Sequence, residues 1–207
     1  MIKLYITDID GIDLKRADEI DAQRAERLKR YRLESDKKRC LAGGLFIKRF
    51  LGDTEIKIGT YGKPEAENGM HFNLSHSGKY VLFALSDSKI GCDIEMIKEV
   101  EPERLGKLVF CPAEMASLEH CDNKTENFFR LWTRKESLLK CIGEGFHRSS
   151  KSVDASGESF TDNGTTYYMS TWLYNGYTVS VCSTEGSIPN TIEYIKLCGA
   201  ASTGTSP

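Results

Sequence analysis

The sequence predicts an α+β fold made of two similar halves with a cleft between them. Apolar residues make up 40% of the 207 residues and charged residues 28%, a balance typical of a globular protein. The segment from Gly78 to Ser86 resembles the segment from Gly176 to Ser183, and each follows a helical pattern at a similar distance. This repetition predicts an N-terminal half over residues 1–97 and a C-terminal half over 98–198. Short apolar strands after a glycine turn are common, so chance explains the repetition equally well.

The elements of the N-terminal half follow from hydrophobic periodicity. Alternating apolar and polar residues predict a strand over 2–9, and scattered apolar positions among charges predict an exposed helix over 18–32. We expect Ser35 to cap a second helix over 36–51, whose apolar stripe faces inward. The pair Gly43-Gly44 costs helix stability, which predicts close packing at that point.

The rest of the chain alternates between strand and helix patterns. Strands are predicted over 55–59, 71–75, 80–86, 89–95, 165–174, 177–183 and 192–197, helices over 102–108, 112–119 and 125–142, a turn over 61–64 and a disordered tail over 199–207. The longest uncharged run, Asn163 to Thr184, is rich in Ser, Thr and Tyr and contains Asn175-Gly176. We interpret it as a β-hairpin and not as a membrane helix.

Charge and cysteine content narrow the class of protein. The 28 basic and 30 acidic side chains give a net charge of −2, which argues against general nucleic-acid binding. The chain meets Asp8 too early for a signal peptide, and its seven cysteines form no CxxC pair. We therefore expect a cytoplasmic protein with reduced thiols, no zinc site and no membrane partner.

Two carboxylates on one predicted strand indicate a metal site. Asp93 and Glu95 are two positions apart, so their side chains point to the same face. Burying them together is costly unless a cation lies between them, and oxygen ligands suit a hard cation such as Mg²⁺. The alternative is an ordinary solvated strand face.

The helix predicted over 125–142 supplies further charged groups. Glu136 and Lys140 lie one turn apart along its edge, while Lys135 falls inside the apolar arc. A lysine in that position must either extend to solvent or meet an anion. Taken with the strand carboxylates, these residues favour a metal–phosphate site over a simple surface ion pair.

Two further segments are candidates for phosphate binding. Ser75 and His76 precede a strong strand, and adjacent residues on an extended segment point apart, so they are not a nucleophile–base pair. They suit a phosphate contact, with a simple polar turn as the alternative. The basic run from Arg24 to Arg39 is either a solvated helix face or an anion-binding patch.

In order, these segments resemble the Sfp-type 4′-phosphopantetheinyl transferases. The family pattern is matched by Gly62-Lys63-Pro64, by the loop Phe72-Asn73-Leu74-Ser75-His76-Ser77, by Gly91-Cys92-Asp93-Ile94-Glu95 and by the helix from Trp132 to Lys140. Cys92 replaces the usual Ile or Val. The four motifs occur in the family order and spacing across about residues 24–180.

The resemblance implies a fold, a reaction and a set of site residues. The fold is two α+β halves related by a pseudo-twofold axis, with the active site in the cleft. The reaction is that of a holo-[acyl-carrier-protein] synthase type enzyme: Mg²⁺-dependent transfer of the phosphopantetheine arm of coenzyme A to a serine of an acyl or peptidyl carrier protein, with release of 3′,5′-ADP. The implied Mg²⁺ ligands are Asp93, Glu95 and Glu136. The implied coenzyme A contacts are Arg27, Arg39, Lys63, Ser75, His76, Lys135 and Lys140, with Arg24 less firmly placed.

The remaining alternatives concern the proton acceptor and the type of activity. Glu114 or Glu136, acting through water, is a candidate general base, although Glu114 could equally satisfy a helix N-terminus. A non-catalytic binding protein and a Mg²⁺-dependent phosphohydrolase are the competing functions. We expect residues 98–125 to meet the carrier protein, and the duplicated halves favour a monomer.

Overall fold

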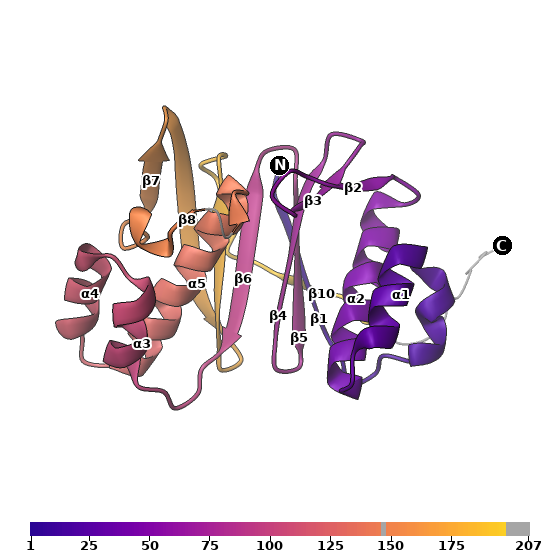
Figure 1. Cartoon of the computed structure of the whole chain (residues 1–207), viewed down its shortest axis with the longest axis horizontal. Helices are drawn as coiled ribbons and strands as arrows, with labels where there is room; N and C mark the ends of the chain where they lie inside the picture. The colour runs from indigo at the N-terminus through magenta and orange to yellow at the C-terminus, as the bar shows by residue number, and fades with distance from the viewer. Residues whose placement is uncertain (146–147, 198–207) are drawn as a thin grey trace.

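The computed structural model describes residues 1–145 and 148–197 and shows a mixed α+β protein, as predicted (Figure 1). Two four-stranded sheets pack against each other in the middle, and helices cover the outer face of each sheet. The predicted tail and Cys198 lie outside the described residues.

The first sheet belongs mostly to the N-terminal part of the chain. Its strands, in spatial order, are β10 (Glu193–Tyr194), β1 (Lys3–Asp8), β5 (Tyr80–Ser86) and β4 (His71–Ser77). The only parallel pair among them joins β10 to β1. Helices α1 (Ala22–Arg30) and α2 (Glu34–Leu51) cover its outer face, where Phe46 stacks on Phe83.

The second sheet is antiparallel and carries the C-terminal helices. Its order is β6 (Ile90–Met96), β9 (Tyr177–Ser183), β8 (Thr165–Tyr174) and β7 (Ser159–Asp162). Helix α5 (Lys124–Ile142) packs on this sheet, and α3 (Pro102–Val109) and α4 (Pro112–Glu119) pack on α5.

The alternation of side chains along β6 decides where the site lies. Cys92 and Ile94 point into the apolar core between the two sheets. The neighbouring positions Gly91, Asp93 and Glu95 therefore face the other way, towards α5. One strand thus contributes both to the core and to a polar surface beneath a helix.

Two helix predictions need correction. The helix expected over 18–32 is a 3₁₀ segment, η1 (Leu14–Glu19), followed by α1, because Asp21 accepts a hydrogen bond from the Arg24 N–H and starts a new helix. Ser35 is not a cap: it lies inside α2 and accepts a hydrogen bond from Arg39. The close packing expected at Gly44 is confirmed, since a Cβ there would lie 2.6 Å from Ile20.

The strand predictions miss the short edge strands. The loop expected after the turn contains β3 (Pro64–Ala66), which pairs with β2 (Ile56–Ile58), and β7 was also unexpected. Only Glu193–Tyr194 of the predicted strand 192–197 pairs in a sheet. Such short strands carry too few residues to show a period.

The hairpin expected in the long uncharged run is confirmed as β8 and β9. In the described part of the chain, no helix is both long and apolar enough to cross a bilayer. β6 hydrogen-bonds to β9 although it falls within residues 1–97, and the predicted boundary between halves stays a prediction.

Candidate metal and phosphate site

Gly91 allows helix α5 to lie directly on strand β6. A Cβ at this position would lie 2.5 Å from the backbone nitrogen of Cys141 and closer still to the carbonyl oxygen of Ser137. Only glycine, which lacks a Cβ, tolerates such a close approach. The last two turns of α5 can therefore lie directly over the strand. Glu136 and Lys140 consequently lie near the side chains of Asp93 and Glu95.

Asp93, Lys140 and Ser75 form one hydrogen-bonded network. The Lys140 ammonium donates to Asp93 Oδ1 at 2.6 Å, to Ser75 Oγ at 3.2 Å and to the Cys92 carbonyl at 3.2 Å. The Ser75 hydroxyl donates to the same carboxylate oxygen at 2.7 Å. Three residues from three separate motifs therefore meet at one buried carboxylate.

The electrostatics of Lys140 reflect this arrangement. Burial is the largest single influence and opposes its positive charge, but Asp93, Cys92 and Glu136 together outweigh it and hold the pKa of Lys140 above its ordinary value. The lysine side chain is still 29% exposed, so one side of it faces solvent. It can therefore meet an external anion while remaining charged.

Two more carboxylates, Glu136 and Glu95, interact electrostatically with Asp93, although the oxygens of the three acids do not all lie within 4.8 Å of one another. Burial raises the pKa of Glu136, and the negative charges of Asp93 and Glu95 raise it further. Burial likewise raises the pKa of Glu95, with an added contribution from Asp93. These three acids repel one another, which is the condition that a bound cation would relieve.

Ser75 and His76 point to opposite sides of β4, as expected for neighbours on a strand. Ser75 faces Asp93, whereas His76 lies near Arg39 of α2. Partial burial of the imidazole ring lowers the pKa of His76, and the positive charge of Arg39 lowers this pKa further. Arg39 itself donates to the Gly78 carbonyl at 2.5 Å and to Asp36.

Lys63 lies at the end of α5 and not at the carboxylates. Its ammonium donates to the Lys140 carbonyl at 2.7 Å and to the Ile90 carbonyl at 2.9 Å. Burial lowers its pKa. The lysine lines a cavity of about 410 Å³ together with His71 and Lys89.

Lys135 and Glu114 lie elsewhere, in a buried ion pair. Lys135 Nζ is 2.8 Å from Glu114 Oε2, and both side chains are fully buried. Lys135 also donates to the Ser150 and Val153 carbonyls, while Glu114 accepts from the N–H groups of Cys111 and Ala155.

This placement bears on two of the expected roles, the coenzyme A contact of Lys135 and the general-base role of Glu114, which both stay predictions. The Lys135 ammonium and the Glu114 carboxylate are engaged with each other and with backbone groups, and neither side chain is exposed to solvent in this structure. The alternative reading of Glu114, a helix N-terminal acid, is the one the structure shows, since it completes a capping box at the start of α4. Lys135 meets an anion, the second of its two predicted options.

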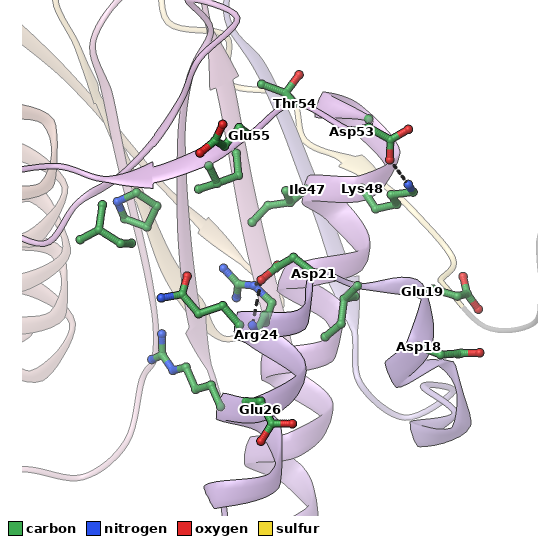
Figure 2. A pocket seen from close by; sticks show the side chains of 18 of the residues that line it. Asp18, Glu19, Asp21, Arg24, Glu26, Ile47, Lys48, Asp53, Thr54 and Glu55 are labelled. Carbon is green, nitrogen blue, oxygen red and sulfur yellow. Dashed lines mark hydrogen bonds and ion pairs between the residues drawn. The ribbon is translucent and has the colours of Figure 1, made fainter.

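The basic residues of α1 face a separate, larger cavity. This cavity of about 1050 Å³ lies between η1, α1, α2 and the β2–β3 arm, and Arg24, Arg27 and Arg30 line it. Figure 2 shows Arg24 beside Asp21, with acidic groups such as Glu55 on the facing wall. Arg24, Arg27 and Arg39 are thus not part of the carboxylate cluster.

A second set of potential ligand atoms has no need of a cation. Cys111, Glu114 and Asp154 lie within 4.8 Å of one another, but Lys135 already balances the charge of Glu114. The six described cysteines are free. We assign no metal to this set.

Sequence reasoning missed Ser77 as a member of the site. Its hydroxyl donates to Glu95 Oε2 at 2.6 Å. The available signal was its position two residues after Ser75 on the same strand, which places both side chains on one face.

The chain is similar to proteins of one known family. Residues 89–185 match the family model described as the 4′-phosphopantetheinyl transferase superfamily. A 4′-phosphopantetheinyl transferase of Bacillus subtilis is 35% identical over 138 residues, which span 61% of this chain and 61% of that protein. The transferase gsp of Aneurinibacillus migulanus is 31% identical over 78% of this chain and 75% of its own length. The transferase Sfp of Bacillus subtilis (strain 168) is 29% identical over 85% of this chain and 87% of its own.

Among solved structures, the holo-[acyl-carrier-protein] synthase of Thermotoga maritima shares 15% identity. It aligns with 46% of this chain and 62% of its own, with a TM-score of 0.37.

Proposed function

The chain belongs to the 4′-phosphopantetheinyl transferase superfamily, and from this premise we propose that it modifies a carrier protein. In the proposed reaction, the phosphopantetheine arm of coenzyme A moves to a serine hydroxyl of an acyl or peptidyl carrier protein. The serine oxygen attacks the β-phosphorus, the bond to the bridging oxygen of the pyrophosphate breaks, and 3′,5′-ADP leaves. The observation that carries the proposal is the meeting of Ser75, Asp93 and Lys140 at one point.

The donor set around Asp93 fits a divalent cation. Asp93 Oδ2 is buried and accepts no hydrogen bond from the described residues, so it is available as a ligand. Glu95 and Glu136 add two carboxylates whose ionised forms the site disfavours. We propose that these three side chains hold Mg²⁺, which prefers oxygen ligands. When bound, Mg²⁺ supplies charge neutralisation for the pyrophosphate.

The chain's own cations complete the phosphate site. Lys140 is fixed by Asp93 and the Cys92 carbonyl, so its charge is held in place before substrate arrives. We propose that it contacts the pyrophosphate together with Ser75. His76, on the other face of β4 beside Arg39, is proposed to contact the 3′-phosphate.

The cavity beside α1 is a candidate for the nucleotide end of coenzyme A. Arg24 and Arg27 line it, and both are among the further coenzyme A contacts that the resemblance implies. Lys63 is also proposed to contact coenzyme A. Its ammonium already donates to two backbone carbonyls, so it has fewer hydrogen atoms left for a phosphate.

Glu114 and Glu136 are the two proposed candidates for the general base, and we favour Glu136 because Glu114 is fully buried and paired with Lys135. We propose that Glu136 accepts the proton of the carrier serine hydroxyl through a water molecule.

The proposal also covers the division of the chain into two halves, the type of activity, the oligomeric state and the location. We propose that residues 1–97 and 98–198 are the two α+β halves with a pseudo-twofold relation. Holo-[acyl-carrier-protein] synthase type activity, a monomeric state and a cytoplasmic location remain part of this proposal.

Incubation with coenzyme A, Mg²⁺ and a panel of purified carrier proteins tests the function. Intact-protein mass spectrometry should show one phosphopantetheine added to at least one carrier. Release of 3′,5′-ADP without a carrier would instead indicate a phosphohydrolase, and coenzyme A binding without any transfer would indicate a binding protein.

A further inference from the structure

Three polar side chains of β4 form a ladder with the backbone of β6. Asn73 Oδ1 accepts from the N–H of Cys92 at 2.9 Å, Ser75 Oγ from that of Ile94 at 3.4 Å, and Ser77 Oγ from that of Met96 at 3.1 Å. β4 and β6 are edge strands of different sheets, so side chains here take the place of a main-chain ladder. The ladder fixes the strand of the carboxylates relative to β4.

The two serines of this ladder have a second role that Asn73 lacks. Ser75 donates its single hydroxyl hydrogen to Asp93, and Ser77 donates its own to Glu95 Oε2 at 2.6 Å. A hydroxyl has one donor hydrogen, so each serine is oriented by a backbone N–H on one side and a carboxylate on the other. Both hydroxyls are therefore held in a single orientation.

Glu95 depends on this contact more than Asp93 does. Asp93 is also held by Lys140, whereas Ser77 is the hydrogen-bond donor to Glu95 among the described residues. The Glu95 side chain is half-buried and lies in the field of Asp93. Without the hydroxyl, repulsion would favour rotamers that turn the carboxylate towards solvent.

We propose that Ser77 is a positioning residue that holds Glu95 in the orientation needed to bind the divalent cation. The inference rests on the proposed function, because it takes Glu95 to be a cation ligand. The hydrogen bond uses Oε2 and leaves Oε1 available. Carboxylate ligands are commonly held in this way, and removing the partner typically lowers metal affinity by about 10- to 100-fold.

The test compares three variants by direct cation binding. Free Mn²⁺ is counted by electron paramagnetic resonance as it is titrated into protein with coenzyme A and no carrier. Ser77→Ala should raise the Mn²⁺ dissociation constant by about 10-fold or more. Ser77→Thr keeps the hydroxyl and should restore wild-type affinity. Asn73→Ala removes one rung of the ladder but no carboxylate contact, so it should lower the melting temperature and keep the Mn²⁺ affinity.

The outcomes separate this inference from the proposed function. Wild-type affinity in a folded Ser77→Ala protein overturns the inference and leaves the proposed function standing. Equal loss of affinity in Asn73→Ala and Ser77→Ala also overturns it, because the ladder as a whole would then be responsible. Absence of saturable Mn²⁺ binding by the wild-type protein overturns the cation site and this inference together.

Discussion

The ammonium of Lys140 lies 2.6 Å from Asp93 Oδ1, although 46 residues separate the two in the chain. The pair joins the C-terminal end of α5 to the middle of β6, at a place where Gly91 allows helix and strand to touch. Because the second oxygen of Asp93 accepts no hydrogen bond from the described residues, the pair is not a closed structural ion pair. The Lys140 ammonium is therefore positioned to bind a phosphate, and Asp93 Oδ2 is available to bind a cation.

Replacing Lys140 with Ala should lower kcat by about 10²-fold, the effect of losing one preorganised charged group. The residue neutralises charge that develops on the leaving pyrophosphate, so we expect kcat to fall more than the affinity for coenzyme A. Steady-state kinetics with a carrier protein measure both. An effect below about twofold would refute the role of Lys140.

Replacing Gly91 with Ala should both destabilise the protein and abolish transfer. The added Cβ would overlap the backbone of α5 at Ser137 and Cys141, which can only be relieved by moving the helix away from the carboxylates. Gly186→Ala is the matched control, because its Cβ would make ordinary contacts at 3.6 Å or more. Thermal unfolding and transfer assays on both variants should differ sharply; similar behaviour would contradict the close approach.

Glu136→Gln should stabilise the protein without cation while removing activity. Burial and Asp93 raise the pKa of Glu136 in the folded state, so the fold favours its protonated form. The cost of ionising it is absent below the ordinary value of 4.5, and it is complete only once the pH exceeds the raised pKa.

The difference in melting temperature between Glu136→Gln and the wild type should therefore grow as the pH rises from about 4 to neutrality. At neutral pH we expect the variant to melt at the higher temperature, because only the wild type then carries the cost of ionising this side chain. Mg²⁺ with coenzyme A should raise the melting temperature of the wild type more than that of the variant. A constant difference across this pH range would contradict the assignment.

Replacing Lys135 with Met should cost about 3–5 kcal/mol of unfolding free energy, because Glu114 would keep a buried charge without its partner. The double variant Lys135→Met with Glu114→Gln should recover part of this loss, since no net charge then remains buried. Urea unfolding measures both. A stable Lys135→Met protein with weakened coenzyme A binding would instead restore the direct role that the family pattern implied.

Replacing Arg27 with Ala should raise the KM for coenzyme A with little effect on kcat, because Arg27 lines the cavity proposed for the nucleotide. Lys29→Ala is the control on the same helix, where the lysine is exposed and paired with Glu26. Equal KM values for the two variants would place the nucleotide elsewhere.

Periodicity predicted the long elements because they bury a continuous face. The strands over 80–86, 165–174 and 177–183 and the helix over 112–119 match the structure residue for residue. The two-residue strand Glu193–Tyr194 pairs with β1 far away in sequence, and no local pattern could reveal such a contact.

The relative positions of site residues were predictable where two of them lie on the same strand or helix. The spacing of Asp93 and Glu95 placed both on one strand face. The apolar arc of α5 contained Lys135 but left open whether that side chain extends to solvent or meets an anion, and the structure shows it buried. The partner of that lysine depends on how α4 packs against α5, which spacing does not encode. For this reason Glu114 became a candidate base before its burial against Lys135 was known, and that role stays a prediction.

Transfer by the Asp93→Asn variant tests the central claim most directly. The substitution keeps the shape of the side chain and removes the negative charge of Asp93, which pairs with Lys140 and is proposed to bind the cation. Intact-protein mass spectrometry of a carrier that the wild type modifies should show one added phosphopantetheine with wild-type enzyme and none with a folded Asp93→Asn protein. Undiminished modification by that variant would contradict the account.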